Sequence, residues 1–195
     1  GLGASSLAIS TIPFANKSIA NERDKLTSYK DITTYNNYYE FGTSKSDPYK
    51  NSQTFKTTPW EIAIEGEVEK PIKLSMEEIS EMFVSEERIY RLRCVEGWSM
   101  VIPWMGFSLS ELLSKVNPTN KAKFVEFESV YDPAQMKGQR YPVLNWPYNE
   151  GLRIDEAMHP LTTVVTGLYG KKLPNQNGAP LRIFIPWKYG FKSAK

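Results

Sequence analysis

The chain contains one cysteine, Cys94, and one histidine, His159, and this scarcity limits how the fold can be held together. One thiol cannot form an internal disulfide, and one cysteine with one histidine cannot complete a zinc site of Cys and His ligands. The fold must therefore depend on a hydrophobic core. Hydrophobic residues make up 41% of the 195 positions, which is enough for one large domain with extensions.

The residues before Cys94 are rich in arginine. Arg88, Arg91 and Arg93 bring positive charge close in sequence, and such charge favours the thiolate, which attacks electrophiles and binds soft metals. On these residues alone, three roles for Cys94 stay open. It is a buried core thiol, a nucleophile with His159 as its base, or a metal ligand whose partner ligands come from a cofactor.

Charge and apolar runs exclude further classes of protein. The formal net charge is only +2, whereas a nucleic-acid-binding domain usually carries a stronger, clustered basic surface. The sequence has no apolar run of about twenty residues, so no full membrane span is visible in it. Neither a Gly-Lys-Ser/Thr phosphate loop nor a Gly-x-Ser-x-Gly elbow occurs. We therefore expect no nucleic-acid partner and find no support for several common enzyme classes.

The first residues resemble the end of an export signal. Residues 1–16 are mostly small and apolar, and their only neighbouring charge follows them. We expect the chain to begin inside its precursor, because the charged start of a signal and an initiator methionine are not in the sequence. Residues 17–34 predict a polar arm, and residues 35–195 the folded domain. An exported protein with one cysteine indicates a bacterial periplasm, where an unpaired thiol must be buried or ligated.

Alternating apolar and polar residues predict several strands. Residues 60–65 alternate and are closed by Gly66. Residues 68–72 predict a return strand that is confined to an edge or replaced by a turn, because Pro71 has no N–H to donate. The other predicted elements are strands over 88–95, 123–130 and 181–185, and a helical turn over 155–158.

Two helix starts are marked by capping boxes, in which a serine and the glutamate three residues later each bond the other's backbone N–H. They are Ser75 with Glu78, and Ser108 with Glu111. The second helix should end before Pro118. Strands outnumber helices and do not alternate with them regularly, which predicts an α+β fold class rather than a doubly wound sheet.

Five segments of the chain stand out when they are taken together. They are Asn36 to Phe41, Arg88 to Met100, Asp155 to Leu161, Gln176 to Arg182, and Pro186 to Lys192. In this order they resemble the catalytic subunits of periplasmic protein-methionine-sulfoxide reductases, which are molybdenum enzymes with the sulfite oxidase fold. The similarity covers nearly everything from residue 27 to the end of the sequence.

The resemblance implies a β-rich, molybdopterin-binding fold with short helices. Its cofactor would be molybdenum with one molybdopterin and no dinucleotide, bound through one protein thiolate and the dithiolene of the pterin. On this match Cys94 is the molybdenum ligand. The residues implied to hold the pterin and its phosphate are Asn36, Tyr39, Glu40, Ser129, Asn177, Arg182, Ser193, Ala194 and Lys195. Amides suit the mixed donors and acceptors of a pterin, and cationic side chains suit a phosphate.

Asn37 and Glu96 are candidate catalytic residues beside the metal. They would orient an oxo or water ligand or relay protons. Glu96 follows Cys94 by two positions and shares its face if the segment is a strand, because strand side chains alternate.

The chain departs from its relatives in four places. Ser129 stands where they carry threonine, and the stretch over 138–148 is shorter and lacks their glycine-rich run. The twin-arginine part of the expected signal is not in the chain. The sequence stops at Lys195, inside a cofactor-binding segment, so we expect a C-terminal portion to be missing.

The resemblance implies an enzyme that reduces methionine sulfoxide, free or in oxidised periplasmic proteins, after export of the folded protein by the twin-arginine route. Electrons would come from a membrane haem-binding subunit linked to quinone. Three other functions stay open on the residues: a sulfite dehydrogenase of the same fold, a non-catalytic exported β-rich binding module, and a hydrolase that uses Cys94 and His159.

Overall fold

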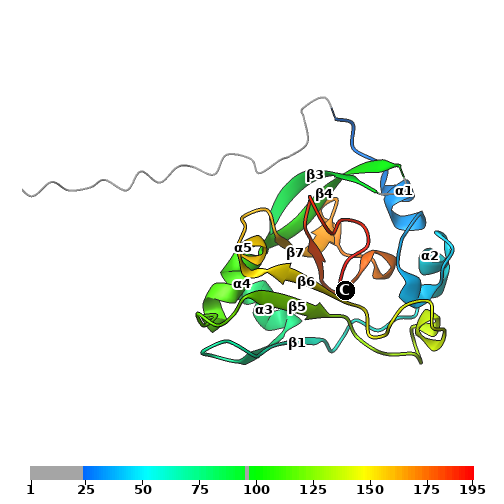
Figure 1. Ribbon diagram of the computed structural model, residues 1–195. Coiled ribbons are helices and arrows are strands. Elements are labelled where there is room, and N and C mark those ends of the chain that lie inside the picture. Colours follow the sequence, from blue (N-terminus) through cyan, green and yellow to red (C-terminus); the bar gives the residue numbers. More distant parts are fainter. Residues whose placement is uncertain (1–23, 95–96) are drawn as a thin grey trace, which may run out of the picture.

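A long antiparallel hairpin, β3 (Glu86–Arg93) and β4 (Ser99–Ser108), forms the centre of the largest sheet (Figure 1). The computed structural model describes residues 24–94 and 97–195. Within them, β7 (Thr163–Leu168) pairs with β4, and β8 (Lys171–Lys172) and β9 (Arg182–Phe184) both pair with β7. All these pairings are antiparallel, so the sheet carries no crossover helices of the kind that parallel strands require.

Two smaller antiparallel pairs lie below this sheet in Figure 1. They are β1 (Glu61–Ile64) with β2 (Ile72–Ser75), and β5 (Phe124–Glu128) with β6 (Asn149–Arg153). The helices are short: α1 (Tyr29–Thr34), α2 (Asp47–Asn51), α3 (Met76–Met82), α4 (Leu109–Val116) and α5 (Ile154–Ala157), with 3-10 turns η1 (Tyr39–Phe41), η2 (Lys137–Arg140) and η3 (Asn175–Asn177). This confirms the predicted α+β class. None of the helices in the described part of the chain is long and apolar enough to cross a bilayer.

Elements with a strong local signal form where the sequence predicts them. The Ser75 side chain accepts the Glu78 N–H at 3.2 Å, and the Glu78 carboxylate accepts the Ser75 N–H at 2.8 Å, so α3 begins with the predicted capping box. Helix α4 ends at Val116, before Pro118, as expected. The return strand that pairs with β1 is β2, which begins only at Ile72, the last residue of the predicted span over 68–72. Before it the chain bends, which is the alternative that Pro71 allowed, and Val68 bridges to Pro118.

Strand β4, which is buried over most of its length, was not predicted from the sequence. A strand covered on both faces has apolar residues at successive positions, so the alternation that marks a half-buried strand is lost. Strand β7 was missed for the same reason, since its residues are buried on both faces except at Thr166.

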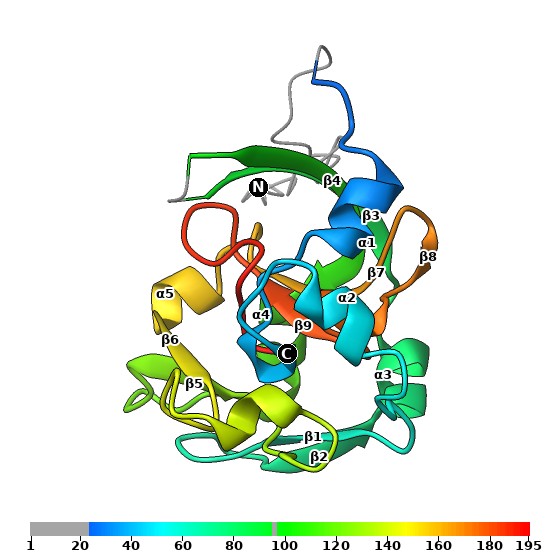
Figure 2. The ribbon, with the colours of Figure 1, turned by 90° about the vertical axis from the view of Figure 1, so that its right-hand side faces the viewer.

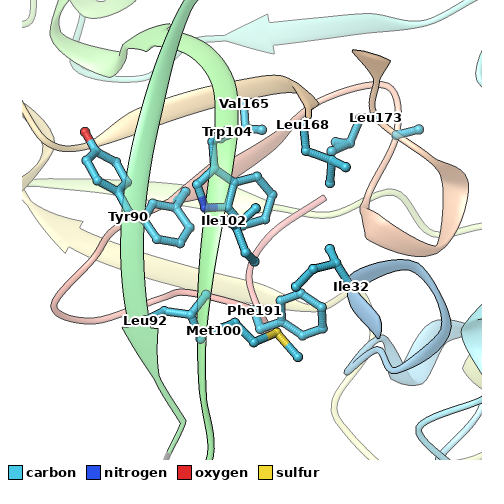
Figure 3. Packing of buried hydrophobic residues seen from close by; sticks show 12 residues of the cluster. Ile32, Tyr90, Leu92, Met100, Ile102, Trp104, Val165, Leu168, Leu173 and Phe191 are labelled. Carbon is cyan, nitrogen blue, oxygen red and sulfur yellow. The ribbon is translucent and has the colours of Figure 1, made fainter. Parts of the chain in front are cut away.

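The main hydrophobic core surrounds the β3–β4 hairpin. Figure 3 shows Ile32 from α1 and Phe191 from the end of the chain meeting hairpin side chains, among them Ile102 and Trp104. A second cluster fills the space between the main sheet, α3, α4 and β6. Its members include Leu74, Ile79, Phe107, Leu112, Leu152 and Ile185. Burial of these apolar surfaces supplies most of the stabilisation that a chain without disulfides requires.

Helix α1 lies within the stretch that the sequence describes as a polar arm. Its Ser28 N-cap accepts the Asp31 N–H at 3.1 Å, and Ile32 is completely buried in the main core. The Thr27 backbone N–H also donates to the Val101 carbonyl oxygen at 3.0 Å, which fastens the start of α1 to β4. Residues 27–34 are therefore packed against the domain.

Candidate cofactor site

Cys94 lies at the tip of the β3–β4 hairpin and is half-buried. Its N–H donates to the Trp98 carbonyl oxygen at 2.8 Å, and its carbonyl oxygen accepts the Gly97 N–H at 3.1 Å. Gly97 has φ of +89°, a left-handed conformation that glycine adopts without strain. The Trp98 ring packs edge-on against Phe191, with centroids 5.9 Å apart. The thiol is thus presented from a tight turn that contacts the 190–195 segment.

The arginines before Cys94 are not all close to the thiol. Arg88 is six residues back along an extended strand, roughly 20 Å at 3.3 Å per residue. It is buried and donates to the Pro160 carbonyl, Thr163 Oγ1 and Ser108 Oγ. Arg88 is therefore too far away to favour the thiolate, contrary to the prediction, and its guanidinium instead ties β3 to the start of α4 and β7.

Two predicted amides, Asn36 and Asn177, meet at a single backbone atom. Their Nδ2 atoms donate to the Ile32 carbonyl oxygen at 2.9 Å and 3.0 Å. Both side chains are buried, and neither Oδ1 has a hydrogen-bond partner among residues 24–94 and 97–195. A buried acceptor without a donor is costly, so this pair of oxygens fits a ligand that carries N–H groups.

Arg182 is buried behind these amides. Its guanidinium donates to the carbonyl oxygens of Asn177 at 3.4 Å and Phe191 at 3.2 Å, and also to those of Gly190 and Ile183. It lies 5.2 Å from the centroid of the Trp104 ring. Arg182 therefore joins η3, β9 and the 190–195 segment from inside the domain.

The predicted residues at the end of the chain lie against the β5–β6 pair. The Lys195 N–H donates to Ser129 Oγ at 3.1 Å, and the Ser129 N–H donates to the Tyr148 carbonyl at 2.8 Å. The serine at position 129 thus keeps the hydroxyl that the resemblance requires. Figures 1 and 2 both place this end of the chain in the middle of the molecule, beside β9.

Cationic side chains and aromatic rings alternate around Tyr39 and Glu40 of η1. Lys195 Nζ lies 4.0 Å from the centroid of the Tyr38 ring. Lys192 Nζ lies 4.0 Å from the Tyr39 ring and 5.0 Å from the Tyr148 ring. Cations held over ring faces are attracted by the π electrons. Lys192 and Tyr38 were not predicted as site residues, although Lys192 stands in one of the five segments that carry the resemblance.

Burial dominates the electrostatics of this cluster. It lowers the pKa of Lys195 to about 7 and the pKa of Arg182 to about 10, and it raises the pKa of Glu40. The negative charges of Glu40 and Glu150 oppose the shift at Lys195. Arg182, Lys192 and Lys195 together outnumber these two carboxylates. The cluster is suited to an anionic group, whose negative charge would favour the protonated lysines.

We expect the stability of the cofactor-free protein to rise with pH because of Lys195. Its pKa falls from the ordinary 10.5 to about 7 on folding, so between these values the unfolded chain binds a proton that the folded chain lacks. The free energy of unfolding then rises with pH across this window, by up to about 1.4 kcal/mol per pH unit. Denaturant unfolding between pH 7 and 9 measures it. Lys195→Met should flatten the rise and exposed Lys172→Met should not; the same slope in all three proteins contradicts the expectation.

The other predicted residues are placed as follows. The Asn37 amide oxygen accepts from Lys45 Nζ at 3.4 Å, and Glu96 lies outside the described residues. His159 is exposed, accepts the Leu161 N–H at 3.2 Å and packs edge-on against Trp187. No group of three or more His, Cys, Asp or Glu side chains that could hold a metal occurs among residues 24–94 and 97–195.

The described site fits a pterin that carries a phosphate. The unpartnered oxygens of Asn36 and Asn177 match the N–H groups of a pterin. The cationic side chains near Glu40, which are Arg182, Lys192 and Lys195, match a phosphate. Gly178 permits close packing here, since an added Cβ would lie 2.8 Å from Lys195 Cγ. The structure brings the predicted pterin and phosphate residues into one connected region, with the Cys94 turn touching it through Trp98 and Phe191.

Known proteins resemble this chain in sequence and in fold. It is 62% identical to the protein-methionine-sulfoxide reductase catalytic subunit of Xanthomonas axonopodis pv. citri and 59% identical to that of Burkholderia mallei. These alignments cover 88% of this chain and 53% and 52% of the relatives, so the chain spans about half the length of the curated relatives it matches. The sulfane dehydrogenase SoxCD from Paracoccus pantotrophus shares the fold, with a TM-score of 0.59 and 16% identity over 78% of this chain and 39% of that one.

A family profile identifies the domain. The profile of the oxidoreductase molybdopterin binding domain matches residues 49–195, which is most of the chain. The predicted fold and the predicted molybdopterin cofactor both agree with this match. The chain therefore belongs to the family of oxidoreductase molybdopterin-binding domains.

Proposed function

We propose that this chain is the cofactor-binding part of a protein-methionine-sulfoxide reductase catalytic subunit. The observation that carries the proposal is its identity of 57–62% to relatives of that name in Xanthomonas, Burkholderia and Pseudomonas, over 88% of the chain. The overall reaction consumes two protons and two electrons and converts a sulfoxide into a thioether and water. It restores a flexible apolar side chain where oxidation had left a polar one.

Each part of the site has a role in this proposal. Cys94 supplies the thiolate that binds the metal, and the Gly97 turn fixes the direction of that thiol. Asn36 and Asn177 accept hydrogen bonds from the pterin, while Lys195 and its neighbouring cations neutralise the phosphate. When bound, molybdenum supplies oxygen-atom transfer, and the protein supplies binding, orientation and charge. Asn37 would orient a water molecule beside the metal.

The location and partners belong to the same proposal. The small, apolar character of residues 1–16 supports export, and the predicted folded cofactor site supports the twin-arginine route, which carries folded proteins. A membrane haem-binding subunit linked to quinone would supply electrons, and oxidised periplasmic proteins would be the substrates. Cell fractionation tests the location: recovery of the protein only in the cytoplasm would contradict it.

The decisive experiment measures metal and turnover on the full-length gene product. Protein purified from the periplasm should contain nearly one molybdenum and one pterin per chain, and should reduce methionine sulfoxide with a reduced dye as electron donor. Sulfite oxidation is measured in parallel. Faster turnover of sulfite than of sulfoxide would replace the proposal with a sulfite dehydrogenase. A folded protein without molybdenum, from a host that makes the cofactor, would contradict both activities.

A further inference from the structure

Strand β6 carries a carboxylate where an apolar residue is expected. Its inward positions are Glu150 and Leu152, and Leu152 is completely buried in the second core cluster. Glu150 is only 7% exposed and lies opposite Phe127 of β5. Removing a carboxylate from water is costly unless hydrogen bonds compensate. An unusual residue at this position therefore points to a specific task.

The task can be read from the hydrogen bonds that Glu150 accepts. Its Oε1 accepts from Ser193 Oγ at 2.9 Å and from the Ala194 N–H. Its Oε2 accepts from the Tyr148 hydroxyl at 3.1 Å. Charged acceptors with several donors make strong, directional bonds. Two of the three donors belong to the residues implied to bind the cofactor's phosphate.

The other side of this segment is held by backbone groups. The Ala194 carbonyl oxygen accepts the Ile183 N–H at 3.2 Å. Ala194 is thus bonded to β9 through its carbonyl oxygen and to Glu150 through its N–H. The Lys195 N–H donates to Ser129 Oγ, next along the β5–β6 pair. Residues 193–195 are thus clamped between β9 and the β5–β6 pair, and Glu150 is the charged member of the clamp.

We infer that Glu150 is a positioning residue that holds residues 193–195 in the shape that binds the phosphate of molybdopterin. The inference rests on the cofactor site described above. Glu150 already occupies the Ala194 N–H, so that N–H serves the clamp and the phosphate is left to the neighbouring cations. Its negative charge also opposes the effect of burial on Arg182, Lys192 and Lys195. Glu150 therefore contributes to the site in two ways that can be separated: the length that lets its side chain bond Ser193 and Ala194, and its negative charge.

Two conservative variants separate reach from charge. Glu150→Gln keeps an oxygen at the same distance from Ser193 and Ala194 and loses the charge, and its amide N–H can still meet the Tyr148 oxygen. Glu150→Asp keeps the charge but is one methylene shorter, so it cannot span the same gap. If Glu150 positions the segment through its hydrogen bonds, Glu150→Gln should retain more cofactor than Glu150→Asp. Exposed Glu128→Gln on β5 is the matched control.

The measurements are cofactor content and amide exchange of the full-length gene product. Molybdenum and oxidised pterin per chain should fall about tenfold in Glu150→Asp, the lower end of what supporting residues around a metal site contribute. Hydrogen exchange at residues 193–195 of the cofactor-free protein should be faster in Glu150→Asp. It should stay near the wild-type rate in Glu150→Gln and in Glu128→Gln. Unfolding temperatures identify any variant that merely fails to fold.

Opposite results would overturn the inference. One is that Glu150→Asp retains more cofactor than Glu150→Gln. The other is that both variants have the cofactor content and the amide exchange rates of the wild-type protein. The exchange experiment needs no cofactor and no turnover. If the wild-type protein lacks molybdenum, the proposed function fails, yet exchange at 193–195 still decides whether Glu150 holds the segment.

Discussion

Replacing Cys94 with serine should lower the rate of sulfoxide reduction more than about 100-fold and remove most of the bound molybdenum. Loss of a residue that only supports a metal ligand already costs up to about 100-fold, and Cys94 is the predicted ligand itself. Serine keeps the shape of the side chain. The bonds that form the turn, from the Cys94 N–H to Trp98 and from the Gly97 N–H to Cys94, are made by the backbone and survive the change. The variant should therefore fold normally and lack only a soft thiolate.

The matched control for this experiment is His159→Gln. His159 is exposed and contacts Trp187 and Leu161, so its replacement should leave metal content and turnover unchanged. Molybdenum analysis, circular dichroism and dye-linked turnover on the three proteins provide the comparison. Full activity in Cys94→Ser would exclude the thiolate as an essential ligand. An activity that needs both Cys94 and His159, and no molybdenum, would identify a cysteine hydrolase instead.

Replacing Arg182 with methionine should lower the free energy of unfolding of the cofactor-free protein by about 1–3 kcal/mol. The Arg182 guanidinium donates to four backbone carbonyl oxygens from η3, β9 and the 190–195 segment. Methionine fills a similar volume and donates no hydrogen bond, so these buried acceptors lose their partner. Arg182→Lys should recover little, because an ammonium cannot reproduce the planar fork of donors. Denaturant unfolding gives the free energies directly.

An exposed arginine supplies the control for Arg182. Arg153 pairs with Asp155 at the surface, and Arg153→Met should leave the unfolding curve unchanged within error. Equal unfolding curves for the Arg182 and Arg153 variants would show that the buried hydrogen bonds do not stabilise the domain. Measuring protein without cofactor separates this effect from any loss of ligand binding.

Local signals in the sequence were sufficient for some elements. The capping box of Ser75 and Glu78 and the alternation over 60–65 involve only near neighbours, and both are confirmed. Strand β2 was misplaced because the partner of Val68 is Pro118, about fifty positions away, and no local pattern reports such a bridge. Strand β4 was missed because burial on both faces removes the alternation on which strand prediction depends.

The site shows the same division between local and distant information. Resemblance to a family identified Asn36 and Asn177, but their convergence on one carbonyl oxygen needs the folded chain. The charged Glu150 at an inward position of β6 was missed, because β6 itself was not predicted. The roles assigned to Asn37 and Glu96 stay predictions.

The contact between Asn177 and Ile32 joins residues 145 positions apart. Closing so long a loop is entropically costly, and folds rich in such contacts form slowly. The site therefore cannot form before residue 177 has been synthesised. It is complete only after β9 and residues 193–195 have been synthesised and have packed against the rest of the domain. The complete site is therefore available to the cofactor only after residues 193–195 have been synthesised.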